Sequence, residues 1–99
     1  MQGNKQCLVV DRASGAISIA DAIAFVSAQE FGAIDIFVGK VRSVNDGRQV
    51  TGISYDMFDP LALVTFEQAA DKAAVQIGVP CRVYVAHAKG RLAIGDIAV

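Results

Sequence analysis

The stretch GAIDIFVGKVR, residues 32–42, decides the fold together with the Asn-Asp-Gly turn that follows it at residues 45–47. Its isoleucine and valine side chains alternate with other residues, which is typical of a β-strand with one well-buried face. We therefore expect a strand over residues 33–41. An Asp-Gly pair supplies the positive φ of a tight hairpin, so residues 50–58 are predicted to be the returning strand.

A helix is expected on either side of this hairpin. Ser18 is a good N-cap for a helix over about residues 19–30, where apolar side chains recur at helical spacing. Asp59-Pro60 is a typical helix start, and an apolar stripe continues through residues 61–77. Gly78 and the proline that follows shortly after it end this second helix.

Short runs at residues 6–10 and 82–87 predict two further strands. A turn is expected at Lys89-Gly90, and residues 97–99 begin one more strand. The order β-α-β-β-α-β favours an α+β fold, with a mainly antiparallel sheet and the helices on one side. Residues 1–99 are thus expected to form a single domain.

Composition narrows the function classes. The chain has 99 residues, is 54% hydrophobic, and carries nine basic against ten acidic side chains, for a net charge of −1. This balance argues against a nucleic-acid binder, and the apolar runs are far shorter than the ~20 residues that span a membrane. The surplus of apolar side chains indicates an interface or a missing piece of the fold, and we expect a homodimer.

The two cysteines, Cys7 and Cys81, lie far apart in apolar runs and form no C-x-x-C pair. We interpret them as free buried thiols of a cytoplasmic protein. No metal site and no cofactor are expected. His87 falls on the apolar face of its strand, where a partly buried core histidine is the default interpretation.

The corner at residues 39–42 is the best candidate binding site. Gly39 lets a ligand approach the backbone closely. Lys40 and Arg42 fall on one face of an extended strand, where the guanidinium of Arg42 is suited to clamp a phosphate. The alternative is that both are solvated charges at the end of an exposed strand.

Two turns carry a family resemblance. The G-A-x-x-x-F-x-G-x-V-R segment ending at Arg42, and the H-x-x-G-x-L-x-x-G-D segment from His87 to Asp96, are similar in order and spacing to the large, catalytic subunit family of molybdopterin synthase, the MoaE family. The resemblance implies that family's hammerhead fold. It also implies that Lys40, Val41 and Arg42 bind a pterin phosphate substrate.

The family's chemistry follows from the same resemblance. Its members convert cyclic pyranopterin monophosphate to molybdopterin, with sulfur from the thiocarboxylated C-terminus of a ubiquitin-like small subunit. Homodimers of the large subunit bind two small subunits, giving a heterotetramer. The resemblance therefore implies a sulfurtransferase of molybdenum cofactor biosynthesis whose sulfur comes from a partner chain.

The chain also departs from the family pattern. Ala88 stands where the family has an arginine after the histidine, and the nearby Lys89 is displaced by one position. The family's catalytic lysine lies beyond the point that matches Val99. We therefore expect a C-terminally truncated domain, no catalytic residue within it, and no activity of the chain alone.

Two alternatives belong to other function classes. One is a shortened, non-catalytic relative that serves as a dimerisation or partner-binding module. The other is a ferredoxin-like domain that binds a small ligand. An RNA-binding version of the second is disfavoured because no segment matches the K/R-G-F/Y-G/A-F-V-x-F/Y signature.

Overall fold

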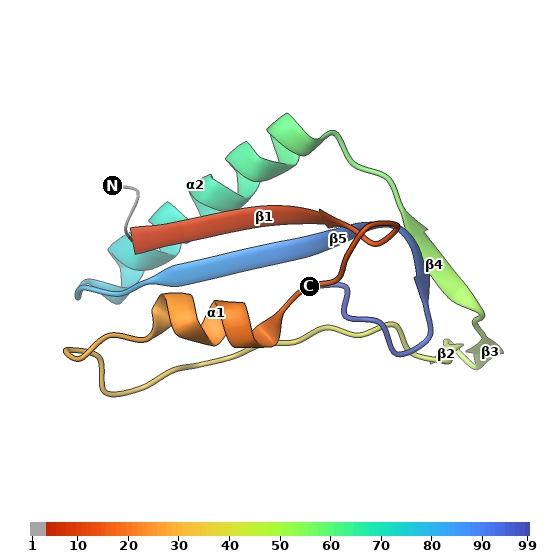
Figure 1. Cartoon of the computed structure of the whole chain (residues 1–99), viewed down its shortest axis with the longest axis horizontal. Helices are drawn as coiled ribbons and strands as arrows, with labels where there is room; N and C mark the ends of the chain where they lie inside the picture. The colour runs from red at the N-terminus through yellow and green to blue at the C-terminus, as the bar shows by residue number, and fades with distance from the viewer. Residues whose placement is uncertain (1–3) are drawn as a thin grey trace.

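The computed structural model describes residues 4–99, so the first three residues of the expected domain lie outside it. Two helices and an open, mixed sheet confirm the α+β class (Figure 1). In chain order the elements are β1 (Lys5–Asp11), α1 (Ile19–Val26), β2 (Val44–Asn45), β3 (Arg48–Gln49), β4 (Gly52–Tyr55), α2 (Asp59–Ile77) and β5 (Val83–Ala93).

The main sheet has the strand order β1-β5-β4. β1 is parallel to β5, with the register running from Lys5 opposite Val83 to Asp11 opposite Lys89. β4 is antiparallel to the end of β5, where Gly52 lies opposite Ala93. The sheet is therefore mixed rather than mainly antiparallel, because its longest pairing, that of β1 with β5, is parallel.

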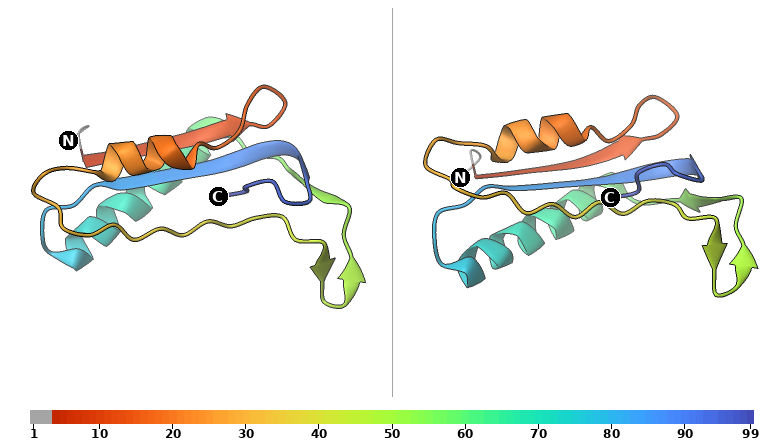
Figure 2. Two further views of the ribbon diagram at one scale, coloured as in Figure 1. Left: turned by 60° about the horizontal axis from the view of Figure 1, so that its bottom comes forward. Right: turned by 90° about the horizontal axis from the view of Figure 1, so that it is seen from below.

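The two helices cover opposite faces of this sheet, which corrects the expectation that both lie on one side (Figures 1 and 2). The ring of Phe25 in α1 lies 6.0 Å from that of Tyr84, and the ring of Phe66 in α2 lies 6.2 Å from that of His87. Tyr84 and His87 are three residues apart on β5 and therefore point to opposite faces. The physical reason is that the first part of β5, residues 83–86, is apolar on both faces and needs cover on each.

The helix ends follow local capping chemistry. The hydroxyl of Ser18 accepts the backbone N–H of Asp21 at 3.1 Å, as expected of the N-cap of α1. The helix then ends at Val26, four residues earlier than predicted, because Ser27 adopts an extended conformation and its hydroxyl donates to the carbonyl of Ile23. α2 ends at Ile77 as predicted.

The hairpin differs most from expectation. The Asn-Asp-Gly turn is present, with φ of 51° at Asp46 and 75° at Gly47, but β2 and β3 have only two residues each. Residues 33–39 are extended without forming a strand, and Lys40 makes a single antiparallel bridge to Ile97. Residues 33–38 make no backbone hydrogen bond within residues 4–99, and β-structure exists only where a partner supplies hydrogen bonds.

The last strand also differs. β5 continues through the expected Lys89-Gly90 turn to Ala93, because β4 pairs with its second half. Gly90 adopts a positive φ within the strand, and the chain turns only at residues 94–95. The glycine thus marks unusual backbone, as its sequence context indicates, but that backbone lies inside a strand and not in a turn.

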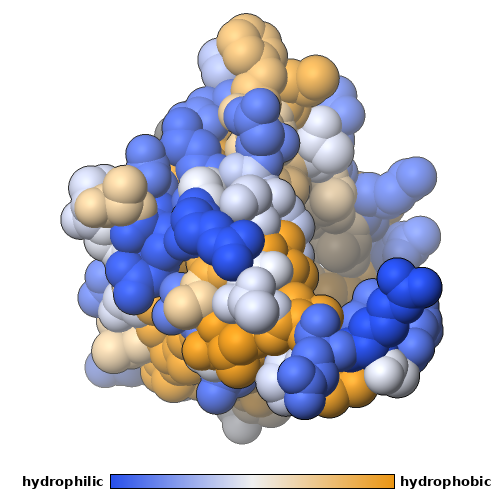
Figure 3. All heavy atoms as spheres, turned by 90° about the vertical axis from the view of Figure 1, so that its right-hand side faces the viewer, coloured by the Kyte–Doolittle hydropathy of each residue, from blue (hydrophilic) through white to orange (hydrophobic). Residues whose placement is uncertain are grey.

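The core is small, and residues close to the C-terminus form part of it. Val41, Ala88, Leu92 and Ala98 form one buried cluster, against which Ile17 and Tyr55 pack. Many large apolar side chains remain exposed instead, among them Phe37 at 82%. Figure 3 shows apolar side chains reaching the surface on the end of the molecule that carries the β2–β3 hairpin. Within the described residues no helix is long and apolar enough to cross a membrane.

Candidate functional site

The predicted corner at residues 40–42 is built around one buried side chain. Val41 is only 3% exposed and belongs to the core cluster. Its backbone N–H donates to the carbonyl of Asp96 at 2.9 Å, and its carbonyl accepts the N–H of Gly95 at 2.7 Å. Val41 therefore anchors the corner with its side chain and both backbone groups, and only its neighbours Lys40 and Arg42 are exposed there.

Lys40 and Arg42 flank this anchor, and both are exposed. Nη2 of Arg42 donates to Oδ1 of Asn45 at 2.7 Å, a bond that holds the guanidinium beside the hairpin turn. A guanidinium has five N–H donors, so most of the donors of Arg42 stay available for an anion. The corner thus presents two cations in an extended backbone that is fixed at its midpoint.

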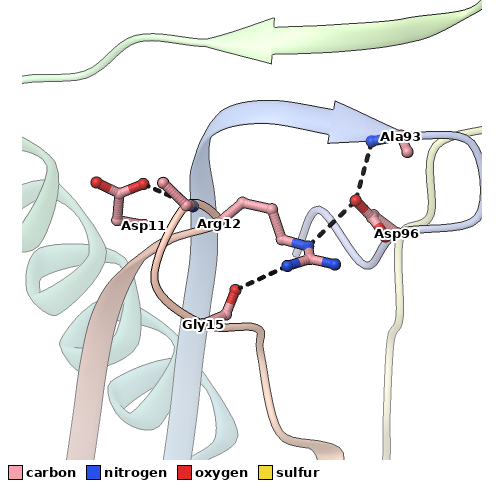
Figure 4. A network of polar contacts seen from close by, with 6 residues as sticks. Asp11, Arg12, Gly15, Ala93 and Asp96 are labelled. Carbon is pink, nitrogen blue, oxygen red and sulfur yellow. Dashed lines mark hydrogen bonds and ion pairs between the residues drawn. The ribbon is translucent and has the colours of Figure 1, made fainter.

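A polar network braces the other side of the corner (Figure 4). Oδ2 of Asp96 accepts the backbone N–H of Ala93 at 2.9 Å and Nε of Arg12 at 3.2 Å. Nη1 of Arg12 in turn donates to the carbonyl of Gly15 at 3.3 Å. Because the carbonyl of Asp96 also bonds to Val41, this network connects the end of β1 to the corner.

The same contacts set the ionisation of Asp96. The hydrogen bond from the N–H of Ala93, supported by the guanidinium of Arg12, lowers the pKa of this carboxyl below its usual value, although burial opposes the shift. Arg12 carries no signal in the sequence, since nothing in its neighbourhood marks it. Asp96 is visible there only as the last residue of the second family-like turn.

His87 and Lys89 are close to each other in β5, and both lie apart from the corner. The half-buried ring of His87 meets Tyr55 edge-on at 4.9 Å and stacks with Phe66, and its Nδ1 lies 2.8 Å from the carbonyl of Ala88. Nζ of Lys89 contacts both carboxylate oxygens of Asp59, at 2.9 and 3.1 Å. This bond to Asp59 raises the pKa of Lys89 and fixes the start of α2 to β5.

The cysteines do not form a reactive pair. Cys7 and Cys81 are both free and half-buried rather than fully buried. Burial is the main cause that raises the pKa of the Cys7 thiol, followed by the charge of Glu67, which disfavours the nucleophilic thiolate. Within residues 4–99 no three His, Cys, Asp or Glu side chains come together as a metal site.

Known proteins resemble this chain over a range that includes the corner at residues 40–42. The family model described as "MoaE protein" matches residues 12–99. The chain is 39% identical over 80 residues to a molybdopterin synthase catalytic subunit from Synechococcus elongatus, covering 81% of this chain and 48% of that protein. It is 42% identical over 87 residues to molybdopterin synthase catalytic subunit 1 from Mycobacterium tuberculosis, covering 84% and 56%.

A molybdopterin synthase catalytic subunit from Pyrococcus abyssi is 34% identical over 79 residues, which cover 80% of this chain and 53% of the relative. The chain therefore spans about half the length of the curated relatives it matches.

Proposed function

Because this chain belongs to the MoaE protein family, we propose that it carries the substrate-binding corner of a molybdopterin synthase catalytic subunit. The observation that carries the proposal is the arrangement of Lys40 and Arg42, two exposed cations on either side of the buried Val41. The ligand is cyclic pyranopterin monophosphate, and its phosphate lies against these two side chains.

The chemistry of the corner supports a phosphate ligand. A guanidinium offers two parallel N–H donors that match phosphate oxygens, and the ammonium group of Lys40 adds a mobile positive charge. The bond from Arg42 to Asn45 restricts the guanidinium before the ligand arrives, which lowers the entropy lost on binding. Gly39, directly before Lys40, keeps the adjoining backbone free of a side chain.

The proposed role of this chain in the reaction is to bind and orient the substrate. The family reaction adds sulfur from a thiocarboxylated, ubiquitin-like small subunit, so we propose such a subunit as the partner. Lys89 is not a candidate acid or base, since its ammonium group is held in the ion pair with Asp59. No catalytic residue is assigned within the described part of the chain.

We further propose that the protein is a homodimer within a heterotetramer. The exposed apolar side chains at the start of α2, Phe58 at 71% and Leu61 at 63%, support a protein interface. The two free cysteines fit a reducing compartment, and we place the protein in the cytoplasm. Sedimentation at low micromolar concentration tests the dimer, and a monomer there would contradict it.

Titration calorimetry with cyclic pyranopterin monophosphate tests the site itself. We expect Arg42→Ala to weaken binding by about 1.5–3 kcal/mol, the usual loss for a hydrogen bond to a charged group, and Lys40→Ala to weaken it less. Lys72→Ala is the matched control, because it removes one exposed positive charge from α2, away from the corner. Equal effects of Lys72→Ala and Arg42→Ala would show that only net charge matters and would refute the site.

A further inference from the structure

The backbone of the candidate binding corner is held by one loop. Within residues 4–99, the backbone hydrogen bonds of residues 40–42 are the two that Val41 makes, with Asp96 and Gly95. The side chain of Arg42 bonds only to Asn45, which belongs to the hairpin that follows the corner. The position of the corner relative to the sheet therefore depends on the packing of Val41 and on the loop of residues 94–96.

This loop is closed on the end of β5. The backbone N–H of Asp96 donates to the carbonyl of Ala93 at 3.1 Å, and Oδ2 of Asp96 accepts the N–H of Ala93 at 2.9 Å. Gly95 between them has a φ of 88°, which glycine adopts at no steric cost. These bonds fix the shape of the loop, but they join it only to its own strand.

Arg12 supplies the contact from outside the loop. Its Nε donates to Oδ2 of Asp96 at 3.2 Å, and within residues 4–99 no other side chain bonds to that aspartate. The backbone N–H of Arg12 donates to the carbonyl of Lys89 in β5 at 3.0 Å. Arg12 is thus fixed to the sheet by its backbone and reaches the loop with its side chain, as Figure 4 shows.

The turn that carries Arg12 is itself well ordered by hydrogen bonds. The carbonyl of Asp11 accepts the N–H groups of Ser14 and Gly15, both at 3.0 Å, and Oδ1 of Asp11 accepts the N–H of Ala13 at 2.9 Å. Nη1 of Arg12 bonds to the carbonyl of Gly15 in the same turn, at 3.3 Å. The guanidinium is therefore restricted from both sides, by its own turn and by the loop.

We propose that Arg12 is a positioning residue of the phosphate site. It holds Asp96, and the backbone of Asp96 holds Val41. Val41 in turn sets where Lys40 and Arg42 lie on either side of it. The inference rests on the proposed function, because it gives Arg12 a role in that same site. A binding constellation has to be held to within about 0.5 Å by the groups that support it, so loss of this support weakens binding without removing a ligand contact.

Amide hydrogen exchange tests the support without any ligand. In Arg12→Ala, we expect the N–H groups of Val41 and Gly95 to exchange about tenfold faster than in the parent, since the loop loses a hydrogen bond to a charged group. Lys5→Ala is the matched control, because it breaks the ion pair with Asp71 at the opposite end of β1. It should leave both rates unchanged. Unchanged rates in Arg12→Ala would overturn the proposal.

Titration calorimetry with cyclic pyranopterin monophosphate tests the effect on binding. Arg12→Ala should weaken binding about 2- to 30-fold, the range for residues that act without touching the ligand. Arg12→Lys, which keeps a cation within reach of Asp96, should recover most of this loss. Lys5→Ala should bind like the parent although it also loses an ion pair of β1. Equal affinities of Arg12→Ala and Lys5→Ala would reduce the effect to general stability and overturn the proposal.

A charge-balanced variant separates position from charge. Combining Arg12→Ala with Asp96→Ala removes the ion pair and leaves the net charge of the protein unchanged. We expect this variant to bind as weakly as Arg12→Ala, because the loop lacks its support in both. A return to the affinity of the parent would show that only the unpaired charge of Asp96 matters, and the proposal would then be wrong.

Arg42→Ala distinguishes failure of this inference from failure of the proposed function. In that background Arg12→Ala should cost less affinity than in the parent, because the group whose position it sets is gone. Fully additive losses would contradict the proposal. If Arg42→Ala alone binds like the parent, the proposed function fails, and the exchange rates of Val41 and Gly95 still decide whether Arg12 holds the corner.

Discussion

Arg12 and Asp96 lie 84 positions apart in the sequence, and Nε of the arginine meets Oδ2 of the aspartate at 3.2 Å. The pair joins the turn after β1 to the loop after β5. Because the backbone of Asp96 also holds Val41, the position of the candidate site depends on an ion pair outside it. Asp96 therefore links the ion pair with Arg12 to the backbone of the candidate site.

Asp96→Asn should destabilise the protein in a pH-dependent manner. The folded-state pKa of Asp96 is depressed, so its contribution is present above the unfolded pKa of about 3.9 and disappears as the pH falls through the lower folded value. Urea denaturation of both proteins between about pH 7 and pH 2 should therefore give curves that differ at neutral pH and converge in acid. Asp35→Asn, an exposed site without an ion pair in residues 4–99, is the control. A constant difference at all pH values would contradict a role for the charge.

Lys89→Gln should show the opposite pH dependence. The bond to Asp59 raises the pKa of Lys89, so its contribution is complete below the unfolded pKa of about 10.4 and is lost as the pH rises through the folded value. The variant should be less stable than the parent at neutral pH, and the difference should shrink in alkali. A double-mutant cycle with Asp59→Asn isolates the pair. Strictly additive effects would show that the ion pair contributes nothing.

Gly52→Ala should destabilise the fold by about 1–3 kcal/mol, the cost of a strained backbone residue. The φ of Gly52 is +156°, and a Cβ there would lie 2.5 Å from the carbonyl oxygen of Leu92 in the adjoining strand. Gly32→Ala is the matched control, because a Cβ at that position would meet nothing within 4 Å, and it should change stability by less than about 0.5 kcal/mol. Chemical denaturation of both variants measures the difference, and equal stability would argue against close pairing of β4 with β5.

Leu92→Ala should cost about 2–5 kcal/mol, the range for truncating a buried leucine. Leu92 has no exposed surface and lies at the centre of a cluster made mostly of smaller side chains. Val75→Ala, at a site that is 80% exposed on α2, should stay within about 0.5 kcal/mol. Thermal unfolding gives both values. A loss below about 1 kcal/mol for Leu92→Ala would show that this cluster is not the main core.

Capping and turn signals in the sequence predicted local features well, whereas the alternation over residues 33–41 predicted a strand that residues 33–39 do not form. Ser18 marks the start of α1, Gly78 follows the end of α2, and the Asn-Asp-Gly turn lies where expected. Each of these features depends on neighbouring residues only, through caps and turn geometry. The parallel pairing of β1 with β5 has no such local signal, and it is the pairing that makes the sheet mixed.

The local geometry of the candidate site was predictable in part, while its role as a binding site stays a prediction. The flanking positions of Lys40 and Arg42 follow from strand alternation, and the structure leaves both exposed. The burial of Val41 between them depends on Ala88, Leu92 and Ala98, residues more than forty positions later in the chain. Arg12 could not be inferred at all, since its partner is brought to it only by the completed sheet.

The parallel register of β1 and β5 also imposes an order on folding. Lys5 pairs with Val83, so β1 has no sheet to join until β5 has been synthesised. Both helices and the hairpin are made before that partner exists. Contacts of such long sequence separation slow folding, because the intervening chain must be ordered before the pairing stabilises it. In a nascent chain β1 therefore stays unpaired until β5 emerges.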